Sequence, residues 1–381
     1  MANRRIHLSS RGARLILILV SLVTSLAVAE VFTRALLPRP GFQKTPTQSP
    51  IIPHPMRGFA YSPDNPGFTN SLGLRDDPIE PGESVDILAV GDSFTVGGGL
   101  PIEEAWPSQL ESSINSASVL PHHIRVVNGG VAAYSLTQIR LLTEELAQQL
   151  KPKVIVVGLF SSRYWRIDDP YVFFHGLAIR RSETQRIKVV DGGVIYTPFT
   201  SRWLKSLDFF LADHFYFGAH LLRLSRSAAK KAVSYIRGNS SQSPPSDTEK
   251  LLQPLLGEIE KIREVCASSN IRLVVMLVNE QDEDGSFKSI EKQYNEVVKS
   301  HCRDLGVTVV DPLPIFEESA HGKPIFRQGN DHHWSSLAQQ VAARELLRVL
   351  TQENILTQET ILNREGLLDF ARNKKVERRE R

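Results

Sequence analysis

Residues 85–100 read VDILAVGDSFTVGGGL, and the interpretation of the whole chain starts from this stretch. An apolar run typical of a buried strand passes directly into Gly91-Asp92-Ser93, and three consecutive glycines follow at 97–99. A serine at the end of a buried strand is a candidate nucleophile, but Gly-Asp-Ser alone also fits a turn or a helix cap. Ser93 therefore needs a base, an orienting acid and an oxyanion site from elsewhere in the chain.

The segments around this strand alternate between two patterns, and the alternation predicts the fold. Short apolar runs typical of strands alternate with longer segments whose apolar residues recur at helical spacing. We expect a three-layer α/β/α sandwich with a five-stranded, mainly parallel sheet, whose ligands bind beyond the C-terminal strand ends. The expected strands are 85–90, 124–128, 153–160, 271–278 and 307–311, and the expected helices are 103–116, 135–150, 248–266, 288–302 and 336–350.

The partners that Ser93 needs are found in FRQGNDHHWSSLAQQ, residues 326–340. Asp331 and His333 lie between the last strand and the last helix, so they belong to the same edge of the sheet as Ser93. The carboxylate can accept from one imidazole nitrogen while the other nitrogen faces the serine. We expect Ser93 to be the nucleophile, His333 the base and Asp331 the orienting acid, with the side chain of His332 pointing away.

These motifs resemble those of the SGNH, or GDSL-type, hydrolases, with GDSF after the first strand and DHHWSS before the last helix. TNSLGLR (69–75) is similar to an Asn-x-x-Gly-x-Arg lead-in of membrane-anchored members, and VVNGGVAAYSLTQ (126–138) to the family's second block. The resemblance covers residues 69–163 and 265–350. It implies an α/β/α fold and the hydrolysis or transfer of acyl esters through a serine nucleophile.

The same resemblance implies the oxyanion donors, with two departures. The family uses the N–H of the nucleophile, a glycine N–H in the second block and an Asn side chain in the third. Here Ser93 keeps the first position, Ala133 stands at the glycine and Ser162 at the Asn. A backbone donor survives the change to alanine if its dihedral angle is allowed, whereas a serine hydroxyl is shorter than an Asn amide and must rotate to donate. We expect Ser93, Ala133 and Ser162 to form the oxyanion site.

The N-terminus predicts a membrane segment. Four arginines within the first 14 residues precede LILILVSLVTSLAVA, and the apolar character resumes after one glutamate. Because cations before an apolar run stay on the cytoplasmic side, we expect 1–14 to be cytoplasmic, 15–37 to be a single-pass anchor, and the rest to lie in the periplasm or at the cell surface. Ala27-Val28-Ala29 leaves open cleavage by a signal peptidase, which would release a secreted form.

The remaining segments divide the chain into parts. Residues 38–80 are rich in Pro, Gly and Ser without a sustained period, which predicts a linker and an irregular lead-in. We expect the hydrolase domain at 81–352, interrupted by an insertion at 164–246, and a solvated tail at 353–381. The insertion has a hairpin signal at 191–193, followed by aromatic-rich helical sequence. It is either a cap over the active site, a packing subdomain or a surface resting on the membrane.

Composition and cysteine usage exclude some functions. The formal net charge of +3 comes from basic ends around a mildly acidic body, which argues against a nucleic-acid partner. Cys266 and Cys302 each lie shortly before a strand and are either a disulfide or two separate buried thiols. The sequence has no Cys-x-x-Cys and no P-loop, so we expect neither a metal nor another cofactor.

Three functions remain. The leading hypothesis is a membrane-anchored extracytoplasmic serine esterase acting on an acyl ester, which could be a carbohydrate ester. The same acyl-enzyme would serve an O-acyltransferase on an envelope or exported polysaccharide if water were excluded from the site. A non-catalytic carbohydrate-binding or assembly protein would keep the fold without a full oxyanion site. Ser162 favours that third hypothesis, whereas the Ser93, His333 and Asp331 set opposes it.

Overall fold

The computed structural model describes residues 10–117, 123–236, 248–281, 286–320, 325–327 and 331–355. The chain divides into two compact units, which consist of Met1–Thr47 with Ser182–Ser243 and of Gln48–Arg181 with Pro244–Arg381. The second unit is the larger and contains the catalytic candidates.

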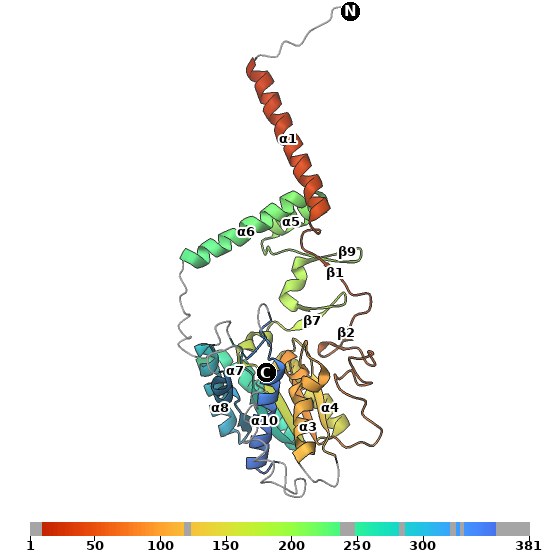
Figure 1. Ribbon diagram of the computed structural model, residues 1–381, viewed down its shortest axis with the longest axis vertical. Helices are drawn as coiled ribbons and strands as arrows, with labels where there is room; N and C mark the ends of the chain where they lie inside the picture. The colour runs from red at the N-terminus through yellow and green to blue at the C-terminus, as the bar shows by residue number, and fades with distance from the viewer. Residues whose placement is uncertain are drawn as a thin grey trace, which may run out of the picture. The chain divides into compact units, whose positions relative to one another are not determined.

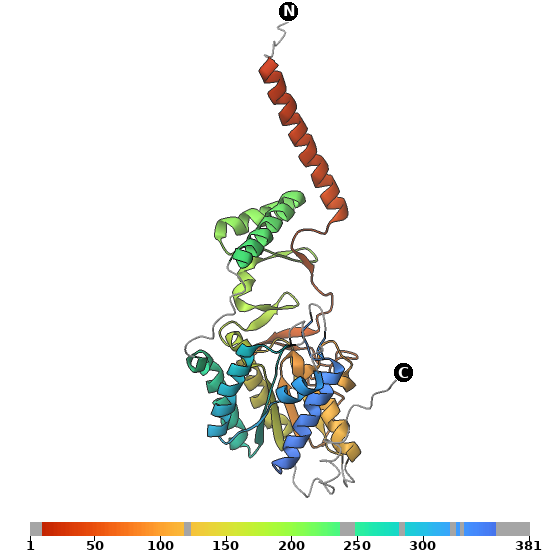
Figure 2. The same ribbon diagram turned by 60° about the vertical axis from the view of Figure 1, so that its left-hand side comes forward.

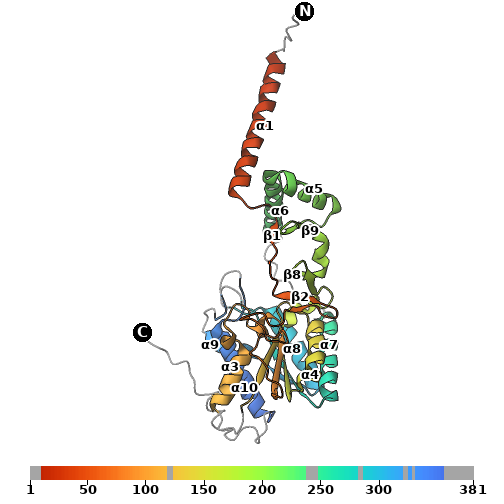
Figure 3. The ribbon, with the colours of Figure 1, turned by 90° about the vertical axis from the view of Figure 1, so that its right-hand side faces the viewer.

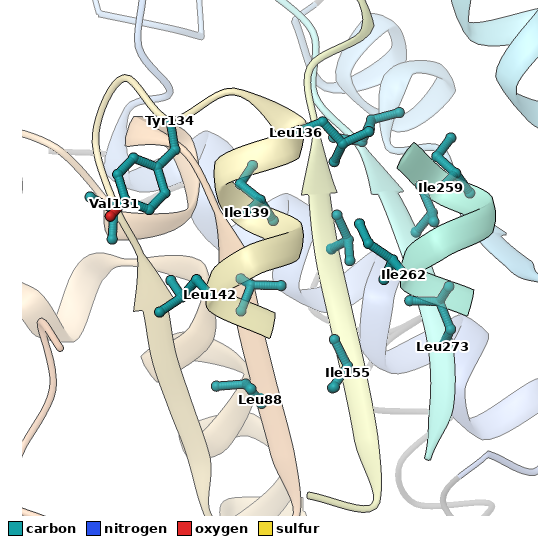
Figure 4. Packing of buried hydrophobic residues seen from close by; sticks show 14 of the residues in the cluster. Leu88, Val131, Tyr134, Leu136, Ile139, Leu142, Ile155, Ile259, Ile262 and Leu273 are labelled. Atoms are coloured by element: carbon teal, nitrogen blue, oxygen red, sulfur yellow. The ribbon is translucent and has the colours of Figure 1, made fainter. Parts of the chain in front are cut away.

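The larger unit is built on a five-stranded sheet in which every strand pair is parallel. The strand order is β12-β11-β6-β4-β5, so the chain places β5 on one side of β4 and β6 on the other (Figure 4). This reversal makes β4 the topological switch point, where open α/β sheets bind ligands beyond the strand ends. Ser93 follows β4 after one intervening residue. The strands are β4 (Ile87–Gly91), β5 (Val126–Gly130), β6 (Val154–Leu159), β11 (Arg272–Leu277) and β12 (Thr308–Val310).

Helices cover both faces of this sheet, as the sequence predicts. Along β4, Leu88 and Val90 face one helix layer while Ile87 and Ala89 face the other. Figure 3 shows the two layers on opposite sides of the sheet, and Figure 4 shows Leu88 packed among apolar side chains of the first layer. The first layer consists of α4 (Leu136–Leu150), α7 (Thr248–Ser268) and α8 (Ser289–Asp304), and the second of α3 (Trp106–Ala117), α9 (Leu313–Ala320) and α10 (Ser336–Gln352).

Two glycines at strand ends make room for the short helix α2 (Ser93–Val96). A Cβ atom on Gly91 would lie 2.0 Å from Oγ1 of Thr95, and one on Gly130 would lie 2.3 Å from the backbone nitrogen of Val96. Both distances are far inside van der Waals contact. Helix α2 can therefore begin directly over the sheet edge because these two strand ends have no side chain.

The segment 38–80, expected to be a linker and lead-in, contains a hairpin at 51–61. Phe59 and Tyr61 of this hairpin are buried. Residues 164–181, expected at the start of the insertion, belong to the larger unit. The strands concerned are only four residues long, too short to show a period in the sequence. The short strands are β2 (Ile51–His54), β3 (Gly58–Tyr61), β7 (Tyr171–Phe174) and β8 (Leu177–Arg180). The larger unit also contains the 3₁₀ helices η1 (Ile102–Glu104) and η2 (Ser161–Arg166).

The smaller unit joins the N-terminal segment to part of the expected insertion. The hairpin predicted at 191–193 is present, and Phe42–Lys44 adds a third strand to it. Two helices follow and pack against each other, as Figure 2 shows. The elements are α1 (Ser10–Leu36), β1 (Phe42–Lys44), η3 (Arg181–Arg186), β9 (Ile187–Val190), β10 (Gly193–Tyr196), α5 (Arg202–His214) and α6 (Tyr216–Ile236).

Helix α1 is long and apolar enough to cross a membrane, and it is the one such helix among the described residues. Within Arg11–Leu36, an 18-residue stretch has a mean hydropathy of 2.5. An N-terminal signal sequence has the same properties, so the helix is consistent with either a signal or an anchor. Of the expected cytoplasmic segment 1–14 and tail 353–381, residues 1–9 and 356–381 lie outside the described part of the chain.

Cys266 and Cys302 are free and buried. Of the two interpretations that the sequence leaves open, the structure has two separate thiols. Burial raises the pKa of each thiol to about 12, so both remain protonated at neutral pH.

Candidate active site

The segment between β4 and α2 presents Ser93 at the sheet edge. Asp92 caps α2, because its side chain accepts a hydrogen bond from the backbone N–H of Phe94 at 3.1 Å. The other oxygen of the same carboxylate pairs with the Arg166 guanidinium at 3.0 Å. Gly97 then ends the helix in the left-handed region, with φ of 69°. Ser93 is thus held in the first turn of a helix that is capped at both ends.

The structure brings Ser93, His333 and Asp331 together across 240 residues of sequence. The Nε2 atom of His333 lies 2.8 Å from Oγ of Ser93, and its Nδ1 atom lies 2.6 Å from Oδ1 of Asp331. An ionised carboxylate only accepts hydrogen bonds, so it fixes the proton on Nδ1. The Nε2 atom is then free to accept the hydroxyl proton of Ser93. His332 is exposed, in agreement with the expected orientation.

Asp331 is held in its ionised form by its neighbours. Burial raises the pKa of its carboxyl, but hydrogen bonds from the ring and backbone of His333, together with the charge of Arg327, outweigh burial and lower it below 3.8. Arg327 lies 2.9 Å from Oδ2 of Asp331 and also donates to the carbonyl of Gly98 at 2.8 Å. The sequence interpretation missed Arg327, whose only signal was its position four residues before Asp331.

Aromatic packing and hydrogen bonds hold the ring of His333 in place. The centre of the Phe94 ring lies 4.9 Å from the centre of the His333 ring and 5.5 Å from the centre of the Trp334 ring. The indole N–H of Trp334 donates to the carbonyl of Asn279 at 2.9 Å. Gln339 on α10 donates to the carbonyl of Phe94 at 3.0 Å. These contacts tie the histidine loop and α2 to one buried framework.

Two backbone N–H groups are candidates for the expected oxyanion site. Among the described residues, no group accepts a hydrogen bond from the N–H of Ser93 or from that of Ala133. Ala133 has φ of +68°, a left-handed conformation that favours glycine and that an alanine adopts only with strain. A glycine at this position would adopt the same conformation without strain.

Ser162 differs from the two backbone candidates. Its hydroxyl is buried and lies close enough to Glu291 to stabilise that carboxylate, although the geometry is not that of a hydrogen bond. Burial is the larger effect and raises the pKa of Glu291. The next residue, Arg163, pairs with Glu280 and stacks on Phe160, with 4.8 Å from its guanidinium carbon to the ring centre. A role for Ser162 as a third oxyanion donor stays a prediction.

The Asn-x-x-Gly-x-Arg lead-in supports the loop that follows Ser93. Oδ1 of Asn70 accepts hydrogen bonds from two backbone N–H groups of the same turn, at 3.0 and 3.1 Å. The turn delivers Arg75, which donates to the carbonyls of Val96 at 2.6 Å and Gly97 at 2.8 Å, and also to that of Leu100. Arg75 therefore satisfies carbonyls at the end of α2 that the helix itself leaves unpaired.

Groups of three or more His, Cys, Asp or Glu side chains that could hold a metal ion are absent from the described residues. The described side chains at the sheet edge form a hydrogen-bonded series of hydroxyl, imidazole and carboxylate. These are the parts that acyl transfer through a serine requires.

No protein-family model matches the chain, and no curated protein matches it. Three solved structures are similar to it at low identity. The acetylxylan esterase Axe2 from Geobacillus stearothermophilus is 16% identical with a TM-score of 0.41, over 71% of this chain and 96% of its own. A lipolytic protein of the G-D-S-L family from Veillonella parvula is 13% identical with a TM-score of 0.39, over 71% and 100%. TesA is 14% identical with a TM-score of 0.39, over 70% and 97%.

Proposed function

We propose that the chain is a serine esterase that works through an acyl-enzyme on Ser93. The observation that carries the proposal is the continuous hydrogen-bonded series from Ser93 Oγ through the His333 ring to the Asp331 carboxylate, with distances of 2.8 and 2.6 Å. A non-catalytic binding protein has no need of this series. The left-handed conformation of Ala133, whose N–H donates to no described residue, gives further support.

The proposed reaction has two halves. Ser93 Oγ attacks the ester carbonyl while His333 takes its proton, and Asp331 stabilises the imidazolium that forms. The N–H groups of Ser93 and Ala133, with Ser162 as a proposed third donor, hold the oxyanion. The C–O bond to the alcohol then breaks, and the alcohol leaves with the proton from His333. Water then attacks the acyl carbon with His333 again as base. The bond between that carbon and Ser93 Oγ breaks, His333 returns the proton to Ser93, and the acid product leaves.

We further propose that the enzyme is anchored in a membrane by α1 and acts outside the cytoplasm. The supporting observations are the length and hydropathy of α1 and the arginines that precede it. Arginines flanking an apolar helix stay on the cytoplasmic side, which leaves the residues after α1 on the other side.

The test is the hydrolysis of p-nitrophenyl acetate by the full-length chain in detergent, alongside Ser93→Ala, His333→Ala and the matched control His332→Ala. Losing the nucleophile or the base should lower turnover roughly a thousandfold or more, towards background, whereas the exposed His332 should be dispensable. A folded wild-type chain as inert as both variants would contradict the esterase. An oligosaccharide acceptor added in excess then distinguishes hydrolase from acyltransferase, because a transferase would acylate the acceptor in place of water.

A further inference from the structure

Helices α5 and α6 of the smaller unit each carry an apolar stripe. The stripes consist of Trp203, Leu207 and Phe210 on α5 and of Phe217, Leu221 and Leu224 on α6. Their spacing of four and three residues places each set on one side of its helix. Trp203 is 70% exposed, Phe210 51% and Leu224 66%, so these stripes are largely open in the unit.

The opposite sides of the same helices are packed. Asp208, Ala212 and Ala219 are buried, and the guanidinium of Arg223 pairs with the Asp208 carboxylate at 2.6 Å. The unit therefore buries an ion pair and small residues while large apolar side chains face outward. A water-exposed surface helix normally has the reverse arrangement.

The junction between α5 and α6 is tied to the C-terminal end of α1, as Figure 1 shows. The carboxylate of Glu30 accepts hydrogen bonds from the backbone N–H groups of Tyr216 and Phe217, both at 2.9 Å. Arg34 donates to the carbonyl of His214 at 2.8 Å, and its guanidinium lies 4.4 Å from the centre of the Tyr216 ring. Glu30 thus caps α6 and pairs with Arg34, which explains a charged residue inside an apolar helix.

The length of α1 fixes the depth of this junction. A hydrocarbon core of about 30 Å is crossed by about 20 helical residues. The apolar run that begins at Leu15 would therefore leave the core near Arg34, the residue that contacts α5 and α6. Aromatic residues are enriched at that depth, and amphipathic helices with basic residues lie there. Helix α6 carries Arg226, Lys230 and Lys231 in its second half.

We propose that α5 and α6 lie in the outer surface of the bilayer that α1 spans, with Trp203, Phe210, Leu221 and Leu224 at the boundary between headgroups and acyl chains. This inference rests on the anchored form in the proposed function, and it is independent of the esterase chemistry. It assigns the two helices a lipid partner, so that three helices of the smaller unit, α1, α5 and α6, contact lipid.

Tryptophan quenching tests the inference on the full-length chain. The chain is reconstituted into vesicles of phosphatidylcholine and phosphatidylglycerol whose phosphatidylcholine is brominated near the headgroup end of its acyl chains. We expect bromolipid to quench part of the tryptophan emission. Trp203→Phe should abolish this quenching, whereas the matched control Trp165→Phe, in the larger unit, should retain it. Trp106 and Trp334 are fully buried and should contribute nothing.

The intact mass of the membrane-bound chain separates the two possible failures. A mass that lacks the N-terminal segment would contradict the anchor and this inference together. An intact, membrane-bound chain whose quenching is absent, or is the same with and without Trp203, would contradict this inference alone. The variant Leu224→Cys tests whether a second copy of the chain covers the stripe. If this variant forms a disulfide-linked dimer in the membrane, the lipid proposal is wrong.

Discussion

At the residue scale, the site depends on single conformations and charges. Ala133 has φ of +68° between β5 and α4, and its N–H is one of the two backbone donors proposed for the oxyanion site. The left-handed region costs a non-glycine residue about 1–2 kcal/mol. Contacts of the surrounding fold offset this cost. One of them is the hydrogen bond that the N–H of the neighbouring Ala132 donates to the Tyr61 hydroxyl at 3.0 Å.

Ala133→Gly should therefore keep the donor and relieve the strain. Relief of the strain raises the stability, but the greater freedom of glycine in the unfolded chain offsets part of this rise. We therefore expect the free energy of unfolding in urea to stay equal to that of wild type or to rise by up to about 1 kcal/mol. Turnover should remain within about twofold of wild type, since the N–H is unchanged. The control Ala132→Gly, at negative φ, should lose about 0.5–1 kcal/mol. A large loss of activity in Ala133→Gly would contradict a role for Ala133 that rests on its backbone N–H alone.

Asp331 makes stability depend on pH in one direction. Because its pKa is lowered in the folded chain, its contribution is fully present above the ordinary carboxyl value near 3.8 and is lost as the pH falls through the lower, folded value. The difference in urea midpoint between wild type and Asp331→Asn should thus be constant at neutral pH and shrink below about pH 4. A gap between wild type and Asp331→Asn that widens on acidification would contradict the pairing with His333 and Arg327.

At the scale of elements, the short helix α2 is positioned by parts far apart in the sequence. Glycines at the ends of β4 and β5 leave it room, and Gln339 of α10 holds the carbonyl of Phe94. Arg75 binds three carbonyls at its C-terminal end. A four-residue helix has almost no stability of its own, so the orientation of Ser93 is set by these contacts.

Arg75→Lys tests this positioning. A lysine keeps the charge but does not have the planar fork that reaches three carbonyls. We expect roughly 2 kcal/mol lower stability and a fall in kcat larger than any rise in KM, because Ser93 loses alignment and not substrate contacts. The exposed Arg303, changed to Lys, should behave as wild type in both measurements. A change confined to KM would mean that Arg75 touches substrate and does not position the helix.

The same scale shows what sequence can predict. The five strands and the helices between them were predictable because long apolar runs and helical periods are local signals. The hairpin of β2 and β3 was not, because four-residue strands have no period to detect and are defined by what they pack against. The Ser93, His333 and Asp331 set followed from the rule that parallel strand ends meet at one edge. Arg327 and the surroundings of Ser162 depend on side-chain directions, which that rule does not give.

At the scale of the whole molecule, two units use different parts of the chain. The smaller one combines the N-terminal helix with residues 182–243 through a three-residue strand pairing and the contacts of Glu30 and Arg34. Such long-range partners leave no local signal, so the sequence suggested a linker and one continuous insertion. The larger unit contains every residue of the candidate active site.

The most direct test of the central claim is covalent labelling of the folded full-length chain with a fluorophosphonate, followed by mass spectrometry of the intact chain and its peptides. The reagent phosphonylates a serine only when a base activates it, so the label reports the nucleophile itself. We predict one adduct per chain, located on Ser93, absent in Ser93→Ala, unchanged in His332→Ala and slowed roughly a thousandfold in His333→Ala. A folded chain that takes no label, or that takes it on another serine, would contradict the account.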